Sequence, residues 1–463
     1  MSLDLLKKEI LDHLLSLRLI LAFVLIIVLL VASGVLFVMD YRAQVSDYNA
    51  QVNANLAILS KNLSDSIFQA FSWSRQNIYR RPNPLGFLSE GKEKDLPNAY
   101  RVSAFRLQGP DYSLRGNPLL GDFDALDWSF VVGIVLSFVA ILLASDGVNG
   151  EKQNGTLRLV LSNPVPRARV LISKYLSTMI LLTIPLAVGG LIGLLVISGS
   201  GLVPLNGQDW AKIGLALGVS VLYLSVFVLL GLLLSTILKE SQASLIVSLL
   251  VWVTLVIVIP SGASLASKFW YSLPDEDAVV RRARHGMQEA FDNHDKRYPH
   301  KDNWIVSGQW SPGESLAKAI AIDQAQDREL FQYEDSKIRQ VRLGQQLART
   351  SPAGLFQSAV LSITGSGIHH YDNFTRQARR YRDELRKLIE ENYPYDRVYP
   401  HFEVRDDISS LKVDYQVVPK FEEKLMTVRE GWSKAIWDTG LLALLNLILF
   451  AATWALFLRY DAR

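Results

Sequence analysis

The run LILAFVLIIVLLVASGVLFVM (residues 19–39) has no charged side chain, and it is long enough to cross a bilayer as a helix, which takes about 20 mostly apolar residues. Five further runs meet this requirement. Together they predict six transmembrane helices, at residues 19–39, 128–145, 175–197, 213–238, 243–260 and 439–458. The second run is the shortest, and a short buried helix is its alternative interpretation. The expected fold class is therefore a mainly α polytopic membrane protein.

The composition also suits a membrane protein with soluble parts. Of the 463 residues, 49% are hydrophobic, and the mean hydropathy is +0.18. The net charge of +3 gives no reason to expect binding to nucleic acid. The chain has no cysteine, which excludes disulfides, cysteine-based zinc sites and thiol catalysis. A large outside region without disulfides is more natural in a bacterium than in a secreted eukaryotic protein.

Basic residues in the short loops predict the orientation, because cytoplasmic loops are enriched in lysine and arginine. With six spans they all fall on one side: Lys7, Lys8, Arg18, Lys152, Arg158, Arg167, Arg169, Lys174, Lys239, Arg459 and Arg463. Both termini are then cytoplasmic, and the location that follows is a bacterial inner membrane. The first run is too long for a cleavable signal and has no clear small-residue cleavage site after it, so we expect a retained anchor.

Residues 1–18 are predicted to form a cytoplasmic amphipathic helix. The apolar positions recur at helical spacing, at Leu3, Leu6, Ile10, Leu14 and Leu17. Charged residues lie away from them, as in helices that rest on a membrane surface. The alternative interpretation is a solvated start to the first span.

Two long charged segments, 40–127 and 263–435, fall on the outside in this topology and are predicted to form a periplasmic domain. The first segment begins as a helical continuation of the first span and becomes loop-rich after Arg81-Pro82-Asn83-Pro84. We expect the two segments to pack together, because each is flanked by spans of a single bundle. The domain is expected to be mostly helical with a few short strands.

Within the second segment, three charged stretches have the pattern of solvated helices: residues 274–297, 312–349 and 372–391. The stretches HFEVR (401–405) and KVDYQVV (412–418) alternate between apolar and polar residues. This period of two predicts short strands.

No motif in the chain indicates catalysis. GxxxxGK[ST], HExxH and GxSxG are all absent from the sequence, so no phosphate-binding loop of the chain's own is expected. The spans have no ionisable side chain between their ends, with Asp438 at the edge of the sixth, which argues against a proton- or ion-driven carrier. Several histidines cluster in the second outside segment: His285, His294, His300, His369 and His370. Their spacings match no closed metal site, so we expect solvated histidines and no bound metal.

The segment between the second and third spans, 146–174, has a distinct pattern. Asn154-Gly155 can form a turn, and Thr156 can cap a short helix over 157–161. Pro164 and Pro166 then break this helix, and a new one starts at Arg167. These features predict a short braced helix at the membrane surface. A plain loop that only fixes the orientation explains them equally well.

The residues E-x3-GTL-x2-VLS-x-PV-x-R-x5-SK, from Glu151 to Lys174, resemble the first cytoplasmic loop of ABC-2-type transporter permeases. The outside stretches RRPNPLGFLSEG (80–91) and SPAGLFQSAVLSITGSGIHHYDNF (351–374) resemble the DUF3526-type subgroup, which is related to multicopper-enzyme-maturation and gliding-motility permeases. The resemblance implies a coupling loop that docks onto a separate ABC ATPase. The implied coupling residues are Glu151, Gly155, Thr156, Leu157, Arg158, Pro164 and Arg167.

The function that this resemblance implies is the permease subunit of an ATP-driven exporter, without enzyme activity of its own. The chain would hold no cofactor, and ATP and Mg would bind to the ATPase partner, present in two copies. The permease would pair with itself or with a sister permease, and a periplasmic partner could join. The alternative is a mechanotransmitting envelope protein, moved by the ATPase without translocating a substrate. A membrane sensor without an ATPase leaves the loop motif unexplained.

Overall fold

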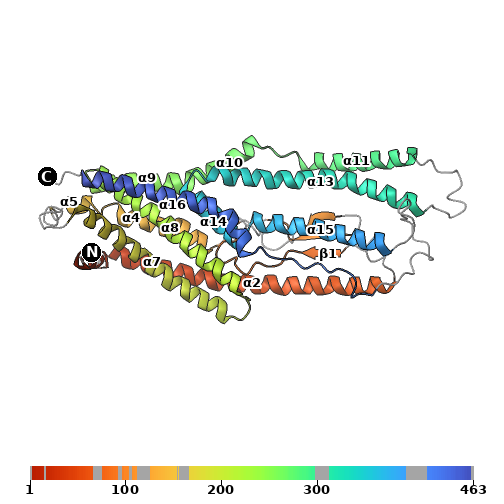
Figure 1. The fold of residues 1–463 in the computed structure, drawn as a ribbon, viewed down its shortest axis with the longest axis horizontal. Coiled ribbons are helices and arrows are strands. Elements are labelled where there is room, and N and C mark those ends of the chain that lie inside the picture. The colour runs from red at the N-terminus through yellow and green to blue at the C-terminus, as the bar shows by residue number, and fades with distance from the viewer. Residues whose placement is uncertain are drawn as a thin grey trace.

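The structure, a computed structural model, describes residues 3–14, 17–65, 76–91, 96–103, 107–111, 126–153, 155, 166–297, 312–392 and 414–459. The molecule is elongated and mainly α-helical, with one small sheet (Figure 1). In this part of the chain, six helical segments are long and apolar enough to cross a membrane: Leu19–Leu63, Trp128–Gln153, Arg167–Gly199, Gly207–Ile237, Ser241–Trp270 and Val428–Leu458. The expectation of a six-span, mainly α membrane protein is thereby confirmed.

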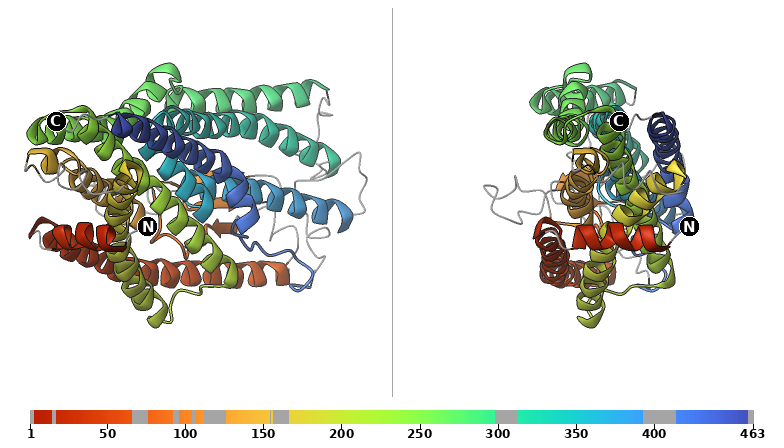
Figure 2. Two further views of the ribbon diagram at one scale, coloured as in Figure 1. Left: turned by 60° about the vertical axis from the view of Figure 1, so that its left-hand side comes forward. Right: turned by 90° about the vertical axis from the view of Figure 1, so that its left-hand side faces the viewer.

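Several of these segments combine more than one helix. The elements are α2 (Leu17–Asp65), α3 (Trp128–Phe130), η3 (Val131–Leu136), α4 (Ser137–Ala144), α5 (Asn149–Gln153), α7 (Arg167–Gly199), α8 (Gly207–Ile237), α9 (Ser241–Val253), η4 (Thr254–Val258), α10 (Ile259–Trp270) and α16 (Val428–Leu458). The elements η3 and η4 are π-helical. An additional helix, α1 (Leu3–Leu14), lies across one end of the bundle (Figure 2, right).

We call this end of the bundle the loop side, defined by α1, α5 and the end of α16. At the opposite end the chain forms a region that we call the distal region. Its elements are the second half of α2, β1 (Gln76–Tyr79), β2 (Ala99–Val102), β3 (Leu107–Asp111), α11 (Glu276–Arg297), α13 (Pro312–Ala348) and α15 (Ile368–Asn392). Figure 1 shows the two ends at opposite extremes of the long axis.

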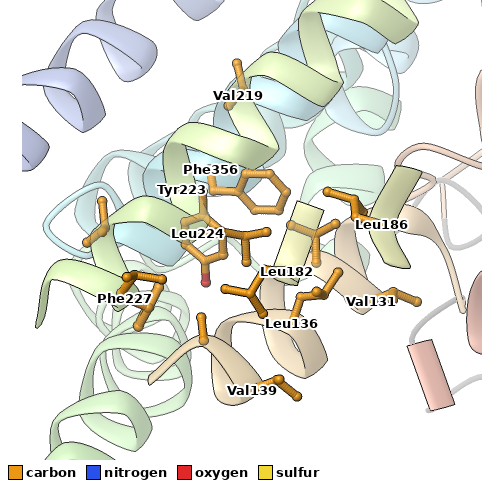
Figure 3. Packing of buried hydrophobic residues seen from close by; sticks show 14 of the residues in the cluster. Val131, Leu136, Val139, Leu182, Leu186, Val219, Tyr223, Leu224, Phe227 and Phe356 are labelled. Carbon is orange, nitrogen blue, oxygen red and sulfur yellow. The ribbon is translucent and has the colours of Figure 1, made fainter. Parts of the chain in front are cut away.

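The bundle core centres on Tyr223 of α8. Its ring stacks on Phe356 of α14 (Pro352–Thr364), with the ring centroids 4.4 Å apart (Figure 3). Its hydroxyl donates to the carbonyl of Gly133 in η3 at 2.8 Å. A π-helical turn interrupts the regular pairing of backbone carbonyls, so this side chain satisfies a group inside the apolar core. The packing therefore joins the second span, the fourth span and α14.

Glycines let the spans approach closely at defined points. A Cβ on Gly193 of α7 would lie 3.1 Å from the carbonyl oxygen of Leu30 in α2. A Cβ on Gly231 of α8 would lie 2.6 Å from the Cβ of Ala144 in α4. Small residues at such crossings increase the van der Waals contact between membrane helices. The contacts α2–α7 and α4–α8 thus depend on the absence of side chains.

The distal region has its own apolar core, to which both outside segments contribute. Leu59 and Leu63 of α2 and Tyr100 of β2 pack with Phe374 and Leu385 of α15. The strands form one antiparallel sheet in the order β1-β2-β3. The expectation that the two segments pack together is confirmed, as is the helical continuation of the first span into α2.

The helix α14 is buried along most of its length and joins the distal region to the bundle. Ser351 caps it by accepting from the backbone N–H of Gly354, and Pro352 occupies its first turn. It ends at Gly365, whose φ of +67° is the left-handed conformation that favours glycine. The expected helix at 372–391 starts earlier, at Ile368, because the turn after α14 closes within 365–367.

One strand prediction was wrong. Residues 415–417 form a turn, and the Asp414 carboxylate accepts from the backbone N–H of Gln416 at 3.0 Å. This short side chain offers the backbone a local partner in place of a neighbouring strand, which explains the failure of the alternation rule here. The predicted strand at 401–405 and residues 412–413 lie outside the described residues.

Candidate functional site

The loop after the second span is anchored through Glu151, which lies on α5. Its carboxylate is 3.0 Å from the ammonium of Lys174 in α7 and 3.3 Å from that of Lys8 in α1. Lys174 also contacts Glu9 of α1 at 3.1 Å. We call these four residues the loop-side charge cluster. It joins three elements that are far apart in the sequence.

The burial of this cluster is uneven. The Lys174 side chain is 4% exposed and Glu9 is 9% exposed, whereas Lys8 at the edge is 40% exposed. A charge held away from water is stable only when opposite charges and hydrogen bonds surround it. Lys174 therefore depends on both carboxylates, and the formal charges of the four residues balance.

The start of α5 is also fixed to the fourth and fifth spans. The hydroxyl of Ser235 in α8 accepts from the backbone N–H groups of Val148 and Asn149, at 3.0 and 3.2 Å. The hydroxyl of Ser244 in α9 donates to the carbonyl of Ser145 at 2.6 Å. These bonds satisfy polar groups at the turn between α4 and α5. A displacement of α5 would therefore act on α7, α8 and α9 together.

Arg167 holds the far end of the loop, and Gly155 forms a turn directly after α5. Arg167 is the first residue of α7, and its guanidinium donates to the carbonyl of Leu458 at the end of α16, at 3.0 Å. Gly155 lies in an exposed turn with a φ of +72°, and its N–H donates to the carbonyl of Lys152. The expected turn at Gly155 and the expected helix from Arg167 are both present.

Of the seven residues predicted for coupling, Glu151, Gly155 and Arg167 are among the described residues. The structure places Glu151 in the charge cluster and Arg167 against the last span. Thr156, Leu157, Arg158, Pro164 and the predicted helix at 157–161 lie outside the described residues. The described short helix of this loop is α5, which directly follows the second span.

Sequence reasoning missed Lys174, Glu9 and Ser235 as parts of the site. Lys174 was assigned to the orientation and to the family motif but not to coupling, although a lysine at the start of a long apolar run needs a partner when it is buried. The sequence also offered a signal for Glu9. This acidic residue lies one position before Ile10, which belongs to the apolar face of a predicted amphipathic helix. Ser235 offered none, since its role depends on which spans are neighbours.

The histidines form no metal centre among the described residues, where no group of three or more potential ligands is placed to hold an ion. His370 is buried against Glu423, with Nε2 3.1 Å from the carboxylate. His369 contacts the hydroxyl of Ser362 at 3.2 Å. Burial lowers the pKa of His369 to about 4, and the nearby cations Lys434, Arg342 and Arg349 act in the same direction. His369 is therefore a partly buried side chain that is neutral at neutral pH. The expectation of solvated histidines was wrong for His369 and His370, whereas His285 lies exposed on α11.

The comparison with known families agrees with this architecture. Residues 3–367 match the family described as ABC-2 family transporter protein. No curated protein matches the sequence. Members of this family generally work with an ABC ATPase partner. The chain therefore belongs to the ABC-2 transporter family, and its six long apolar helices make it the membrane-spanning permease component of an ABC exporter.

Proposed function

We propose that this permease is coupled to its ATPase through the segment 146–174, with the loop-side charge cluster as the mechanical link. The observation that carries the proposal is the pair of contacts from Glu151 to Lys174 and Lys8. Glu151 lies within this segment and contacts the buried ammonium of Lys174, so we assign it to transmission of movement. The contact surface for the ATPase is assigned to the segment from Gly155 to Pro164.

The connections of this loop support a concerted response of the bundle. The Glu151–Lys174 contact leads to α7, the Ser235 bonds lead to α8, and the Arg167 bond leads to α16. Buried ion pairs have strict geometry and resist sliding, since a separated partner would leave a charge uncompensated. A push on the loop would thus tilt several spans at once.

The proposal includes the remaining parts of the assembly. ATP and Mg would bind to two copies of the ATPase, and the permease would pair with a second copy or a sister permease. The basic residues of the loop side assign that side to the cytoplasm of a bacterial inner membrane, so the distal region would be periplasmic and open to a further partner. We also propose the DUF3526-type subgroup, from the residues at 80–91 and 351–374.

A specific observation favours the alternative of mechanotransmission. Arg349, which follows α13, contacts Asp438 of α16 through both carboxylate oxygens, at 2.7 and 3.0 Å. Asp438 also accepts from the hydroxyl of Ser358 in α14 at 2.8 Å. The contact at 3.0 Å is a charge-assisted hydrogen bond, which is stronger than a neutral one, so Arg349 and Asp438 are held together firmly. Movement of the last span would therefore be passed directly to the distal region.

The coupling proposal is tested with the tagged full-length chain copurified with its ATPase and reconstituted in vesicles. Glu151→Gln should leave the complex assembled but reduce permease-dependent stimulation of ATP hydrolysis, whereas Gln153→Ala, on the exposed face of α5, should not. The chain alone should hydrolyse no ATP. Equal stimulation in both variants would favour a loop that only fixes orientation.

A label on the distal region distinguishes transport from mechanotransmission. A spectroscopic probe at Gln416→Cys should report ATP-dependent movement in either case. Arg349→Ala should suppress this movement in the mechanotransmitting protein and leave ATP turnover intact. Export of an amphiphile that persists in Arg349→Ala, despite the loss of distal movement, would identify transport as the primary function.

A further inference from the structure

An apolar cavity lies between α2, α7 and α8 at the distal end of the bundle. It has a volume of about 200 Å³ and is lined by Leu30, Ser33, Gly34, Leu186, Ala187 and Gly190, among others. Phe87, Leu88 and Trp128 also line it. An engineered apolar cavity of about 150 Å³ stays dry and binds a small hydrophobic ligand, so a site of this size suits an apolar guest and not water.

The close contacts of the surrounding helices maintain this cavity. At Gly190, a Cβ would lie 2.8 Å from the Trp128 ring, and the Trp128 indole N–H donates to Ser220 at 2.9 Å. At Gly34, a Cβ would lie 3.1 Å from the carbonyl oxygen of Gly193. The ring of Trp128 is thus fixed by a hydrogen bond, and α2 is fixed against α7. The packing of these helices therefore forms and maintains the cavity.

Two of the lining side chains are exposed on the outside of the bundle, Leu191 at 62% and Leu217 at 37%. They belong to α7 and α8, so the cavity reaches the face of the bundle that lipids cover. Ile197 lies near the end of α7, and Ile213 lies near the start of α8. The opening is therefore close to the membrane–water boundary, where Trp210 at the start of α8 is also exposed.

One polar group in the cavity lacks a partner. Ser33 is 5% exposed and lines the cavity, and among the described residues its hydroxyl makes no hydrogen bond. Ser220 and Ser235, by contrast, are buried serines of the same bundle whose hydroxyls are bonded. A hydroxyl that is open to an apolar cavity is stabilised when a ligand in the cavity supplies an acceptor. This hydroxyl points to a guest that carries an oxygen acceptor next to an apolar chain.

We propose that the cavity binds the carbonyl end of one acyl chain of a membrane phospholipid. The methylene groups would fill the space between Leu30, Leu186 and Leu194, and the ester carbonyl would accept from Ser33. Ser33 lies in the distal half of the first span, so it is closer to the distal headgroups, beside which ester groups lie, than to those of the loop side. The site is independent of the proposed coupling to the ATPase and goes beyond it.

The test uses the full-length chain in nanodiscs of phosphatidylethanolamine and phosphatidylglycerol, without an ATPase. A tracer phospholipid carries a photoactivatable diazirine on its acyl chain, and a second tracer is identical except for ether linkages. After photolysis, mass spectrometry maps the labelled peptides. The ester tracer should label residues 186–197 and 213–217 preferentially, and the ether tracer should label them about two- to tenfold less, as expected for one lost hydrogen bond.

Three variants test the position of the site and the role of the Ser33 hydroxyl. Ala187→Phe fills the cavity and should reduce labelling there at least fivefold, and Ser33→Ala should make the ester and ether tracers equivalent. Ile192→Phe, on the exposed face of α7, is the matched control and should change nothing. Labelling spread evenly over all lipid-facing helices, or unchanged in Ala187→Phe, would overturn the site. Equal labelling by both tracers on the unmodified chain would overturn the acyl-ester assignment even if a variant failed to fold.

Discussion

At the residue scale, Lys174 shows how a membrane protein places a charge at the end of an apolar helix. Its ammonium lies between the carboxylates of Glu9 and Glu151, and 4% of its side chain is exposed. Removing one member of such a buried set leaves the others uncompensated, which costs far more than the pair itself contributes. The same reasoning does not apply to Lys8, whose side chain is 40% exposed.

We predict that Lys174→Met lowers the free energy of unfolding by about 3–5 kcal/mol, because Glu9 then keeps a buried negative charge without its partner. Lys8→Met is the matched control and should cost about 0–1 kcal/mol, since its ion pair is solvated. Thermal unfolding of the purified chain in detergent measures both. Equal melting temperatures for the two variants would show that the cluster does not stabilise the loop side.

A second residue-scale prediction concerns pH. Burial and nearby cations lower the pKa of folded His369 to about 4, while the unfolded value is about 6.5. Between these values the unfolded chain binds more protons, so the stabilisation present above pH 6.5 is lost as the pH falls toward 4. We expect the free energy of unfolding to decrease by about 1 kcal/mol from pH 7.5 to 5.5 through this group.

His369→Gln should remove this part of the pH dependence, and His285→Gln on the exposed helix α11 should retain it. Melting temperatures of the three proteins at pH 7.5, 6.5 and 5.5 measure the slopes. The hypothesis fails if the His369→Gln slope equals that of the unmodified chain. The comparison between variants matters because other groups also titrate in this range.

At the element scale, the contact between α14 and α16 depends on Gly431. A Cβ at this position would lie 2.7 Å from the carbonyl oxygen of Ser362 and 2.9 Å from that of Ile363. Both are backbone atoms at the end of a buried helix, so they can move only if α14 moves. Gly440, two and a half turns later on the same helix, has no atom within 4 Å of its virtual Cβ.

We predict that Gly431→Ala destabilises the protein by about 1–3 kcal/mol, the usual cost of overpacking. Gly440→Ala should cause no loss, because the added methyl meets open space and alanine favours the helix. Thermal unfolding compares the two, and protease sensitivity of the distal region reports whether α14 has loosened. A Gly431→Ala protein as stable as Gly440→Ala would show that this contact tolerates a shift.

Helices were the elements that sequence patterns predicted best, because apolar runs and helical spacing are local properties. The expected helix that starts at Arg167 and leads into the third span, and the continuation of the first span into α2, are both observed. The loop-side contacts could not be predicted, since Glu9, Glu151 and Lys174 meet only when three separate helices converge. The failed strand at 412–418 shows the converse limit, where a local Asp414 contact overrides alternation.

At the scale of the whole molecule, α2 connects the two ends. Its 49 residues, at about 1.5 Å per residue, extend roughly 74 Å, more than twice the 30 Å core of a bilayer. Figure 1 shows it running from the loop side to the distal region. The orientation of this axis decides whether the charge cluster can meet a cytoplasmic ATPase, so the coupling proposal depends on the topology.

We predict that single cysteines report opposite sides of the membrane, because the natural chain has none to interfere. Gln416→Cys lies exposed in the distal region and should react with a membrane-impermeant maleimide on intact spheroplasts. Gln153→Cys lies exposed on α5 and should react only after permeabilisation. We assign the loop side to the cytoplasm because cytoplasmic loops are enriched in basic residues. The reverse labelling pattern would place the charge cluster outside and exclude an ATPase partner at this loop.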